Sequence, residues 1–132
     1  MQTITIDANP QTKERARFRN GRAYTPIKTR AYQERVARIW REKYPEPNAG
    51  AVAIYVQFYL RIPSSWTKAK KDRAERGEIL PTVRPDVDNL AKCIFDGLNG
   101  VAYQDDKQIV QMIVSKRYSK NPRTRVCVSE VV

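Results

Sequence analysis

The chain has 132 residues, of which 25 are lysine or arginine and 14 are aspartate or glutamate, giving a formal net charge of +11 at pH 7. This length fits one domain, and the hydrophobic content of 41% is ordinary for a chain that folds without disulfides or a structural metal. No apolar run reaches the length of a membrane span, and the first ten residues lack the pattern of a secretory signal, so we expect a cytoplasmic protein.

The sequence contains no histidine. This absence excludes Ser-His-Asp and Cys-His catalysis, histidine general bases and histidine-ligated metal nucleases. The two cysteines, Cys93 and Cys127, lie in separate apolar segments without a CxxC motif. We expect them to be buried, reduced thiols rather than zinc ligands. Any catalysis therefore has to use carboxylates, lysine, tyrosine or a metal ion held by oxygen ligands.

A sequence pI of about 10.0 indicates a polyanionic partner, either nucleic acid or an anionic membrane. The basic residues come in blocks with aromatic residues among them, rather than along one amphipathic helix. This arrangement favours nucleic acid and argues against a membrane. Charge alone does not separate an enzyme from an architectural or ribosome-associated protein.

In chain order, residues 3–7 (TITID) predict a short first strand. Residues 9–28 have no steady apolar period and many arginines, which indicates a long basic loop or a loose hairpin. From Thr29 to Tyr44 apolar residues recur at mostly three- and four-residue steps and predict a helix. Residues 51–62 (AVAIYVQFYLRI) show the clearest strand alternation in the sequence.

Two more helices are predicted in the middle of the chain. Residues 64–81 (SSWTKAKKDRAERGEILP) contain a serine suited to an N-cap, good helix formers and Gly77 as a stop. The apolar face of this segment is thin, so we expect a solvated and mobile helix. The next helix is predicted from about Asp88 to Leu98, with Asp88 as its N-cap.

The last two apolar segments, QIVQMIVSKRY and TRVCVSEVV, are joined by SKNPR and predict an antiparallel hairpin. Taken together, the elements predict an α+β fold. We expect residues 1–132 to form a single domain, with a mostly antiparallel or mixed sheet that carries helices on one face.

Five of the acidic residues fall within the stretch RPDVDNLAKCIFDGLNGVAYQDDKQI, and four of these form two tight pairs, Asp86 with Asp88 and Asp105 with Asp106. Residues two apart in an extended segment point the same way, so the first pair can face one point. If the chain returns along the helix after Leu98, the second pair lies beside the first. Clustered carboxylates repel one another unless a cation lies among them, and oxygen ligands suit Mg²⁺.

A purely structural interpretation of these acids stays open on composition and spacing alone. Asp88 can be a helix cap, and Asp105 and Asp106 can belong to a turn. Asp88 and Lys92 are also spaced as a helix surface pair, which contributes about 0.3–0.5 kcal/mol. An EF-hand loop does not fit, because its glycine and closing glutamate are missing.

The same stretch closely resembles the signature of the RusA family of Holliday junction resolvases. The shared pattern is D-x-D-N-x-x-K, a helix that ends in D-G-L, and then an aromatic-containing link before D-D-x-Q-I. The upstream segment RFRNGRAYTPIKTRAYQERVA is similar to the basic N-terminal region and first helix of that family. The resemblance covers most of the chain in order.

The resemblance implies a RusA-like domain that acts as a Mg²⁺-dependent, structure-selective endodeoxyribonuclease, with Mn²⁺ able to replace Mg²⁺. Such an enzyme resolves four-way DNA junctions by paired symmetric nicks in recombination and repair, works as a homodimer without a nucleotide cofactor, and is bacterial or phage-encoded. The implied catalytic and metal-binding residues are Asp86, Asp88 and Asp106, with Lys92 as the active-site lysine and Asp105 as an assisting acid.

Two basic blocks are then predicted to contact DNA phosphates. Phe18 and Tyr24 lie within the first block and are candidates for stacking on unpaired bases. Two alternatives stay open: a non-catalytic basic nucleic-acid-binding protein, and a nuclease acting on other branched DNA. The predicted DNA-binding residues are Lys13, Arg15, Arg17, Arg19, Arg22, Lys68, Lys70 and Lys71, with Arg73 and Arg76 completing the second block.

Overall fold

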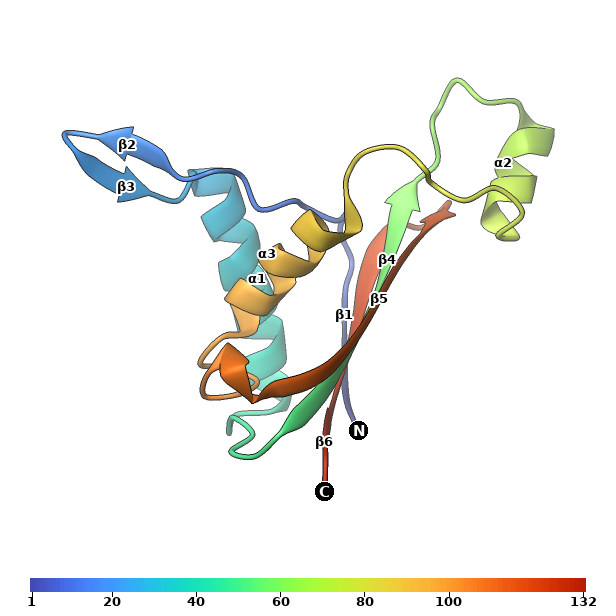
Figure 1. The fold of residues 1–132 in the computed structure, drawn as a ribbon. Coiled ribbons are helices and arrows are strands. Elements are labelled where there is room, and N and C mark those ends of the chain that lie inside the picture. The colour runs from blue at the N-terminus through green and yellow to red at the C-terminus, as the bar shows by residue number, and fades with distance from the viewer.

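A four-stranded sheet forms the centre of the molecule in the computed structural model, which describes residues 1–132 (Figure 1). Its strands lie in the order β1-β6-β4-β5. β6 is antiparallel to both of its neighbours, whereas β4 and β5 run parallel to each other. The mixed sheet, together with the helices, confirms the predicted α+β class. The strands are β1 (Gln2–Ile6), β4 (Val52–Arg61), β5 (Ile109–Ser119) and β6 (Arg123–Glu130).

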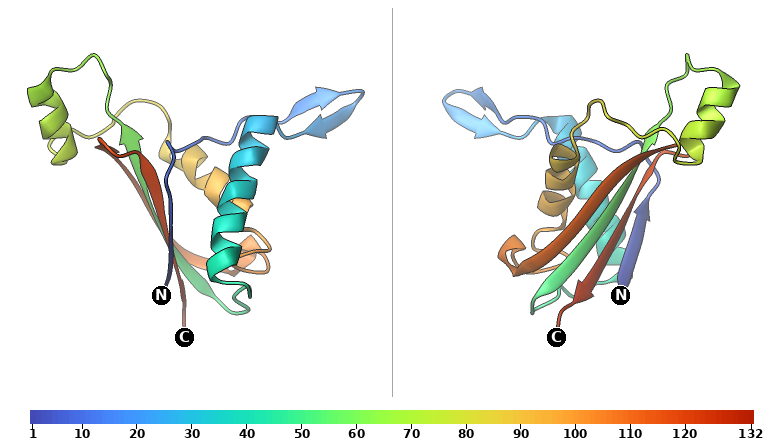
Figure 2. Two further views of the ribbon diagram at one scale, coloured as in Figure 1. Left: turned by 180° about the vertical axis from the view of Figure 1, so that it is seen from behind. Right: turned by 45° about the vertical axis from the view of Figure 1, so that its right-hand side comes forward.

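The alternation predicted for β4 is confirmed. Every second side chain from Val52 to Leu60 is buried, whereas Tyr55, Gln57 and Tyr59 point to the other face and are partly exposed. Successive side chains of a strand point to opposite faces, so this pattern assigns one face of the sheet to the core. The helices α1 and α3 cover that face, and the other face is open (Figure 2).

The predicted hairpin of the two last strands is wrong, because β4 lies between β5 and β6. The two strands run in opposite directions, as expected, but each pairs with β4 along most of its length. A turn sequence specifies that the chain reverses and leaves open which strand it pairs with next. β5 becomes an edge strand, where Val110, Met112 and Ile113 are exposed, while β6 is an interior strand.

Two helices pack on the covered face of the sheet, α1 (Ile27–Lys43) and α3 (Val87–Leu98). They approach each other closely at Gly97, where an added Cβ would lie 3.3 Å from the backbone oxygen of Gln33. None of the helices has the length and apolar character of a membrane-spanning segment. The buried helix residues are Thr29, Tyr32, Val36 and Trp40 of α1, and Leu90, Ala91, Cys93, Ile94, Gly97 and Leu98 of α3.

The start of α3 differs from the prediction. The helix begins at Val87, so Asp86 takes the N-cap position and Asp88 lies within the first turn. The Asp86 side chain makes no capping hydrogen bond. Asp86 is extended, with ψ of 141°, whereas Asp88 is helical, so the two residues do not share the extended backbone that the sequence suggested.

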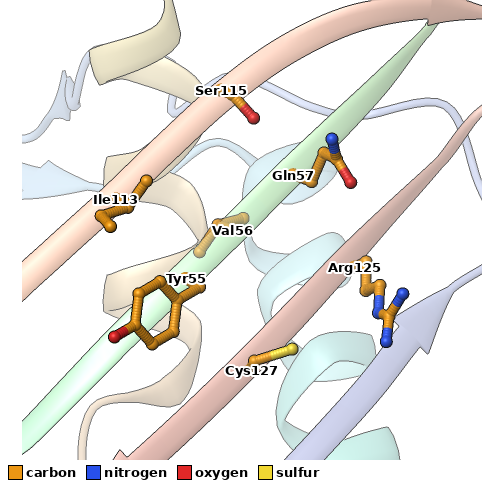
Figure 3. Close-up of a pocket in the computed structure, with 7 residues that line it drawn as sticks. All are labelled: Tyr55, Val56, Gln57, Ile113, Ser115, Arg125 and Cys127. Carbon is orange, nitrogen blue, oxygen red and sulfur yellow. The ribbon is translucent and has the colours of Figure 1, made fainter.

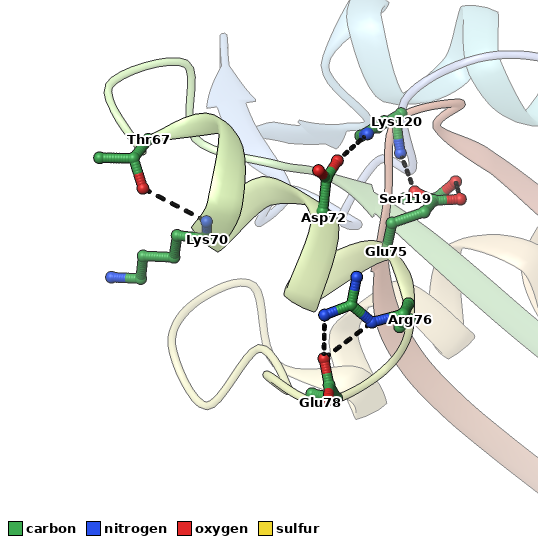
Figure 4. A network of polar contacts seen from close by, with 8 residues as sticks. All are labelled: Thr67, Lys70, Asp72, Glu75, Arg76, Glu78, Ser119 and Lys120. Atoms are coloured by element: carbon green, nitrogen blue, oxygen red, sulfur yellow. Dashed lines mark hydrogen bonds and ion pairs between the residues drawn. The ribbon is translucent and has the colours of Figure 1, made fainter.

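The helix predicted within residues 64–81 is short, α2 (Lys68–Glu75), and Thr67 rather than a serine is its N-cap. Only Ala74 is buried, in agreement with the thin apolar face. Two acidic residues of α2 bind the helix to Lys120, which follows β5. Asp72 pairs with the Lys120 ammonium, and the Glu75 carboxylate accepts a hydrogen bond from the Lys120 backbone N–H at 2.5 Å (Figure 4).

The basic segment 9–28 contains a two-stranded hairpin, β2 (Arg17–Arg19) and β3 (Arg22–Tyr24), which projects from the body (Figures 1 and 2). Asn20 and Gly21 have φ of 52° and 75°, the left-handed pair that a tight hairpin turn requires. All residues of both strands are exposed. The predicted basic hairpin is confirmed, and its turn is tighter than expected.

Candidate active site

Asp86 and Asp88 lie exposed at the N-terminal end of α3. None of the four ion pairs of the structure involves either carboxylate. The positive end of the helix dipole favours negative charge here. Asp86 borders an open hollow whose rim also includes Lys13 and Arg84. Both carboxylates therefore have oxygen atoms free for an external cation.

Lys92 follows one turn after Asp88 on the exposed side of α3. The Asp88–Lys92 surface pair considered from the spacing is not among the ion pairs of the structure. Asp96 lies a further turn along, and its carboxylate pairs with Lys13 at 2.5 Å. The exposed stripe of α3 thus carries an acid, an unpaired lysine and a paired acid in succession.

Asp105 and Asp106 lie beyond the other end of α3. Asp105 caps the short helix η1 (Asp106–Gln108), because its carboxylate accepts the Lys107 backbone N–H at 2.9 Å and its own N–H donates to the Gln108 side chain at 2.8 Å. The Lys107 N–H, and then a hydrogen bond with Asp106, lower the pKa of Asp105. The same hydrogen bond, with desolvation and repulsion by Asp105, raises the pKa of Asp106. Asp105 is committed to the cap, whereas Asp106 is exposed.

One chain does not bring the two acidic pairs together. The 12 residues of α3 separate Asp86 from the Asp105–Asp106 segment, a helix length of about 18 Å. Figure 1 shows η1 at the end of α3 opposite the loop that carries Asp86. No three carboxylates or thiols of the chain are close enough to hold a metal ion. The expectation that the second acidic pair lies beside the first is wrong. The acids come before β5, and it is β5 that runs back to the start of α3.

The donor set of the first pair fits a hard divalent cation. Mg²⁺ usually binds to one or two protein carboxylates and completes its coordination with water and substrate phosphates. Asp86 and Asp88 provide two carboxylates with no competing partner, and no histidine or thiolate lies nearby to favour zinc. The third carboxylate of the predicted site, that of Asp106, does not lie beside this pair within one chain.

The hairpin arginines of the first predicted DNA-binding block and the helix of the second block lie on either side of the loop before α3, whereas Lys13 lies against α3 itself. In each view the β2–β3 hairpin projects on one side and α2 on the other, with the loop before α3 between them (Figures 1 and 2). Three basic side chains of the blocks already have partners in the chain. The Lys13 ammonium pairs with the Asp96 carboxylate, and the Arg17 guanidinium lies 3.7 Å from the Glu14 carboxylate. The Lys70 ammonium lies 4.0 Å from the centre of the Trp66 ring. The exposed members of the blocks are Lys13, Arg15, Arg17, Arg19, Arg22, Lys68, Lys70, Arg73 and Arg76, and Lys71 is half-buried.

A hollow with a partly apolar lining lies on the open face of the sheet and is separate from the acids (Figure 3). Tyr55, Gln57, Ile113, Arg125 and Cys127 contribute to its lining, and none of them is an acid. The hollow therefore offers no carboxylate to hold a metal or to move a proton, and we exclude it as the catalytic centre.

Sequence reasoning missed one residue beside the acids. Lys116, in the middle of an apolar strand, donates hydrogen bonds from its ammonium to the backbone oxygens of Val83 and Pro85. Its only sequence signal is a charge at a position where β5 faces the helices. Lys116, and not the second acidic pair, is the part of the returning chain that reaches the start of α3.

Comparison with known proteins identifies the family of the chain. The family model of endodeoxyribonuclease RusA matches residues 7–129. The chain is also 39% identical over 135 residues to the uncharacterized protein YqaN of Bacillus subtilis (strain 168), with 97% of this chain and 95% of that protein covered. The acidic stretch, both basic blocks and all strands but β1 lie within or almost within the matched residues. The chain belongs to the RusA endodeoxyribonuclease family.

Proposed function

We propose that the protein is a Mg²⁺-dependent, structure-selective endodeoxyribonuclease that resolves four-way DNA junctions by paired symmetric nicks, in DNA recombination and repair. The observation that carries this proposal is the exposed pair Asp86 and Asp88, free of protein partners, between two basic surfaces. Membership of the family supports the endonuclease activity, and the geometry supports an active site at the start of α3.

The proposed roles follow from position and charge. Asp86 and Asp88 would hold Mg²⁺, which supplies an activated water and stabilises charge on the phosphoryl oxygens. Lys92 is exposed one turn away, without a carboxylate partner, so its ammonium is free to offset negative charge on the phosphate. Asp106 rather than Asp105 is the better further ligand, because Asp105 caps η1.

A homodimer would reconcile the separated acids with one site. In a two-fold dimer whose α3 helices run antiparallel, the start of α3 in one chain lies beside the end of α3 in the other. Asp86 and Asp88 of each chain would then meet Asp106 of the second copy. Such a dimer has two sites related by the same symmetry as the two strands that are cut in a junction.

The basic surfaces would bring DNA to these sites. The hairpin and α2 lie on either side of the loop before α3 (Figure 1), so a DNA arm that crosses the start of α3 would contact the arginines of the hairpin and the exposed lysines of α2. Phosphate contacts of this kind supply affinity and salt dependence without sequence choice. Phe18, which is 76% exposed on the hairpin, can stack on an unpaired base at the crossover.

The decisive experiment compares wild type with Asp88→Asn on a synthetic four-way junction, a flap, a splayed arm and plain duplex. We expect Asp88→Asn to slow Mg²⁺-dependent junction cleavage by about 10³-fold or more and to bind the junction at least as tightly, because one negative charge is removed. Glu46→Gln, which removes an exposed charge outside the site, controls for charge and should cleave like wild type.

Each other outcome selects an alternative. A wild type that cuts none of the four substrates with Mg²⁺ or Mn²⁺ is a binding protein and not a nuclease. Equal cutting of all four substrates would remove the preference for junctions and leave a general nuclease. Preferential cutting of flaps or splayed arms would make the substrate another form of branched DNA.

A further inference from the structure

The side chain of Lys116 connects the edge strand of the sheet to the loop before α3. Lys116 lies on β5 opposite Phe58 of β4, on the face that the helices cover. Its ammonium donates to the backbone oxygen of Val83 at 2.8 Å and to that of Pro85 at 2.9 Å. Asp86 follows Pro85 directly. The contact therefore reaches the residue next to the first proposed metal ligand.

The loop between Glu78 and Asp86 has no other hydrogen bond. No backbone or side-chain bond besides those from Lys116 involves residues 79–85, and Leu80 and Val83 are exposed. A loop with exposed apolar side chains and few hydrogen bonds lies at the low end of local stability. Its position then depends largely on the two bonds from Lys116 and on Ile79 and Pro81, which are at least partly buried.

Lys116 is half-buried and has no carboxylate partner in the chain. Hydrogen bonds from an ionised donor are roughly twice as strong as those between neutral groups. Two such bonds, to carbonyls two residues apart, fix both the position and the direction of the segment that leads into α3.

We propose that Lys116 is a positioning residue, which holds the loop at Val83 and Pro85 so that the Asp86 carboxylate stays where the metal and the phosphate meet. The inference rests on the proposed function and adds a residue to its machinery. Lys116 acts through the backbone and does not touch the reacting atoms. Misplacement of a reacting group by about 1 Å can slow a reaction about 100-fold.

The test compares Lys116→Met, Lys116→Arg and the control Lys43→Met. Methionine keeps much of the apolar stem and loses the donors, whereas arginine keeps them. Lys43 also donates to a backbone oxygen, that of Thr3 at 2.9 Å, but on α1 away from the acids. We would measure single-turnover junction cleavage, the Mg²⁺ concentration for half-maximal rate, and junction affinity without metal.

We expect Lys116→Met to cleave about 10- to 100-fold more slowly and to need more Mg²⁺, with junction affinity within about twofold of wild type. Lys116→Arg should recover most of the rate, and Lys43→Met should match wild type. Cleavage by Lys116→Met at the wild-type rate would overturn the proposal. A parallel loss of rate and affinity in Lys116→Met, without rescue by arginine, would also overturn it.

Amide order parameters of Val83, Arg84 and Asp86 test the same contact without any activity. We expect them to fall from rigid values of about 0.85 toward about 0.6 in Lys116→Met, and to stay unchanged in Lys43→Met. Unchanged order parameters in Lys116→Met would refute the positioning role. If wild type cleaves no branched DNA, the proposed function fails, while this measurement still decides whether Lys116 holds the loop.

Discussion

Asp86 and Asp106 lie at opposite ends of α3, with the 12 residues of that helix between them. Each therefore belongs to a different local environment: Asp86 is the N-cap of α3 between the basic surfaces, and Asp106 lies in η1 near Asp96. A shared site for both requires two chains, and this requirement can be tested with inactive variants.

Co-expression of Asp88→Asn with Asp106→Asn should restore nicking of a four-way junction, although each variant alone is inactive. If sites form between chains, a mixed dimer keeps one intact site, with wild-type Asp86 and Asp88 from one chain and wild-type Asp106 from the other. Only one strand of each junction would be cut. Two affinity tags would verify mixing, and mixed dimers that never nick would place all the acids of a site in one chain.

Arg19→Ala should weaken junction binding and reduce its salt dependence. Arg19 is exposed on the projecting hairpin and has no ion-pair partner. Loss of one phosphate contact makes the negative slope of log K against log salt shallower by about 0.9. Binding titrations at several salt concentrations measure this slope. Arg41→Ala, in the last turn of α1, is the matched control, and an equal change of slope in that variant would argue against a specific role for the hairpin.

Gly97→Ala should destabilise the protein by about 1–2 kcal/mol, because the added methyl group lies 3.3 Å from the Gln33 backbone oxygen and pushes α1 away from α3. The gain in helix propensity on replacing glycine, about 1 kcal/mol, is not enough to offset this crowding. Urea unfolding measures the difference. Gly50→Ala, with no atom within 4 Å of the new Cβ, is the control and should be close to neutral. A more stable Gly97→Ala would show that α1 can move away from the added methyl group without loss of packing.

Cys93 should resist alkylation in the folded protein, whereas Cys127 should react. Burial raises the pKa of the Cys93 thiol from its ordinary value of 9.0 to about 11, so almost no thiolate forms at pH 8. Cys127 lies on the open face of the sheet and is only partly buried. Mass spectrometry after iodoacetamide treatment, in native buffer and in urea, would compare the two. Equal native rates would contradict the assigned burial.

The same pKa shift predicts a loss of stability at high pH. The folded state holds the Cys93 proton to a higher pH than the unfolded chain does. The contribution of the protonated thiol to the free energy of unfolding is therefore complete below pH 9.0 and is lost as the pH rises through about 11. Urea unfolding under reducing conditions at pH 8 and pH 10.5 would measure it. The decrease should be smaller in Cys93→Ala relative to its own stability at pH 8.

Most of the secondary structure could be predicted from the sequence, which also suggested a chemistry for the acids. The alternation of β4, the apolar face of α3 and the basic hairpin depend on residues close together in the chain, so local periodicity predicts them. The lack of histidine and the acidic stretch indicated an oxygen-ligated metal, and the family match agrees with the endonuclease assignment.

The arrangement of these elements in space became clear from the folded structure alone. β4 lies between β5 and β6 because strand order depends on which apolar faces pack together, and a turn sequence does not encode this. For the same reason β5 returns Lys116 to the loop before α3, while Asp105 and Asp106 stay at the far end. Contacts between residues far apart in the chain are set by the packing of the whole sheet, beyond the reach of spacing and composition.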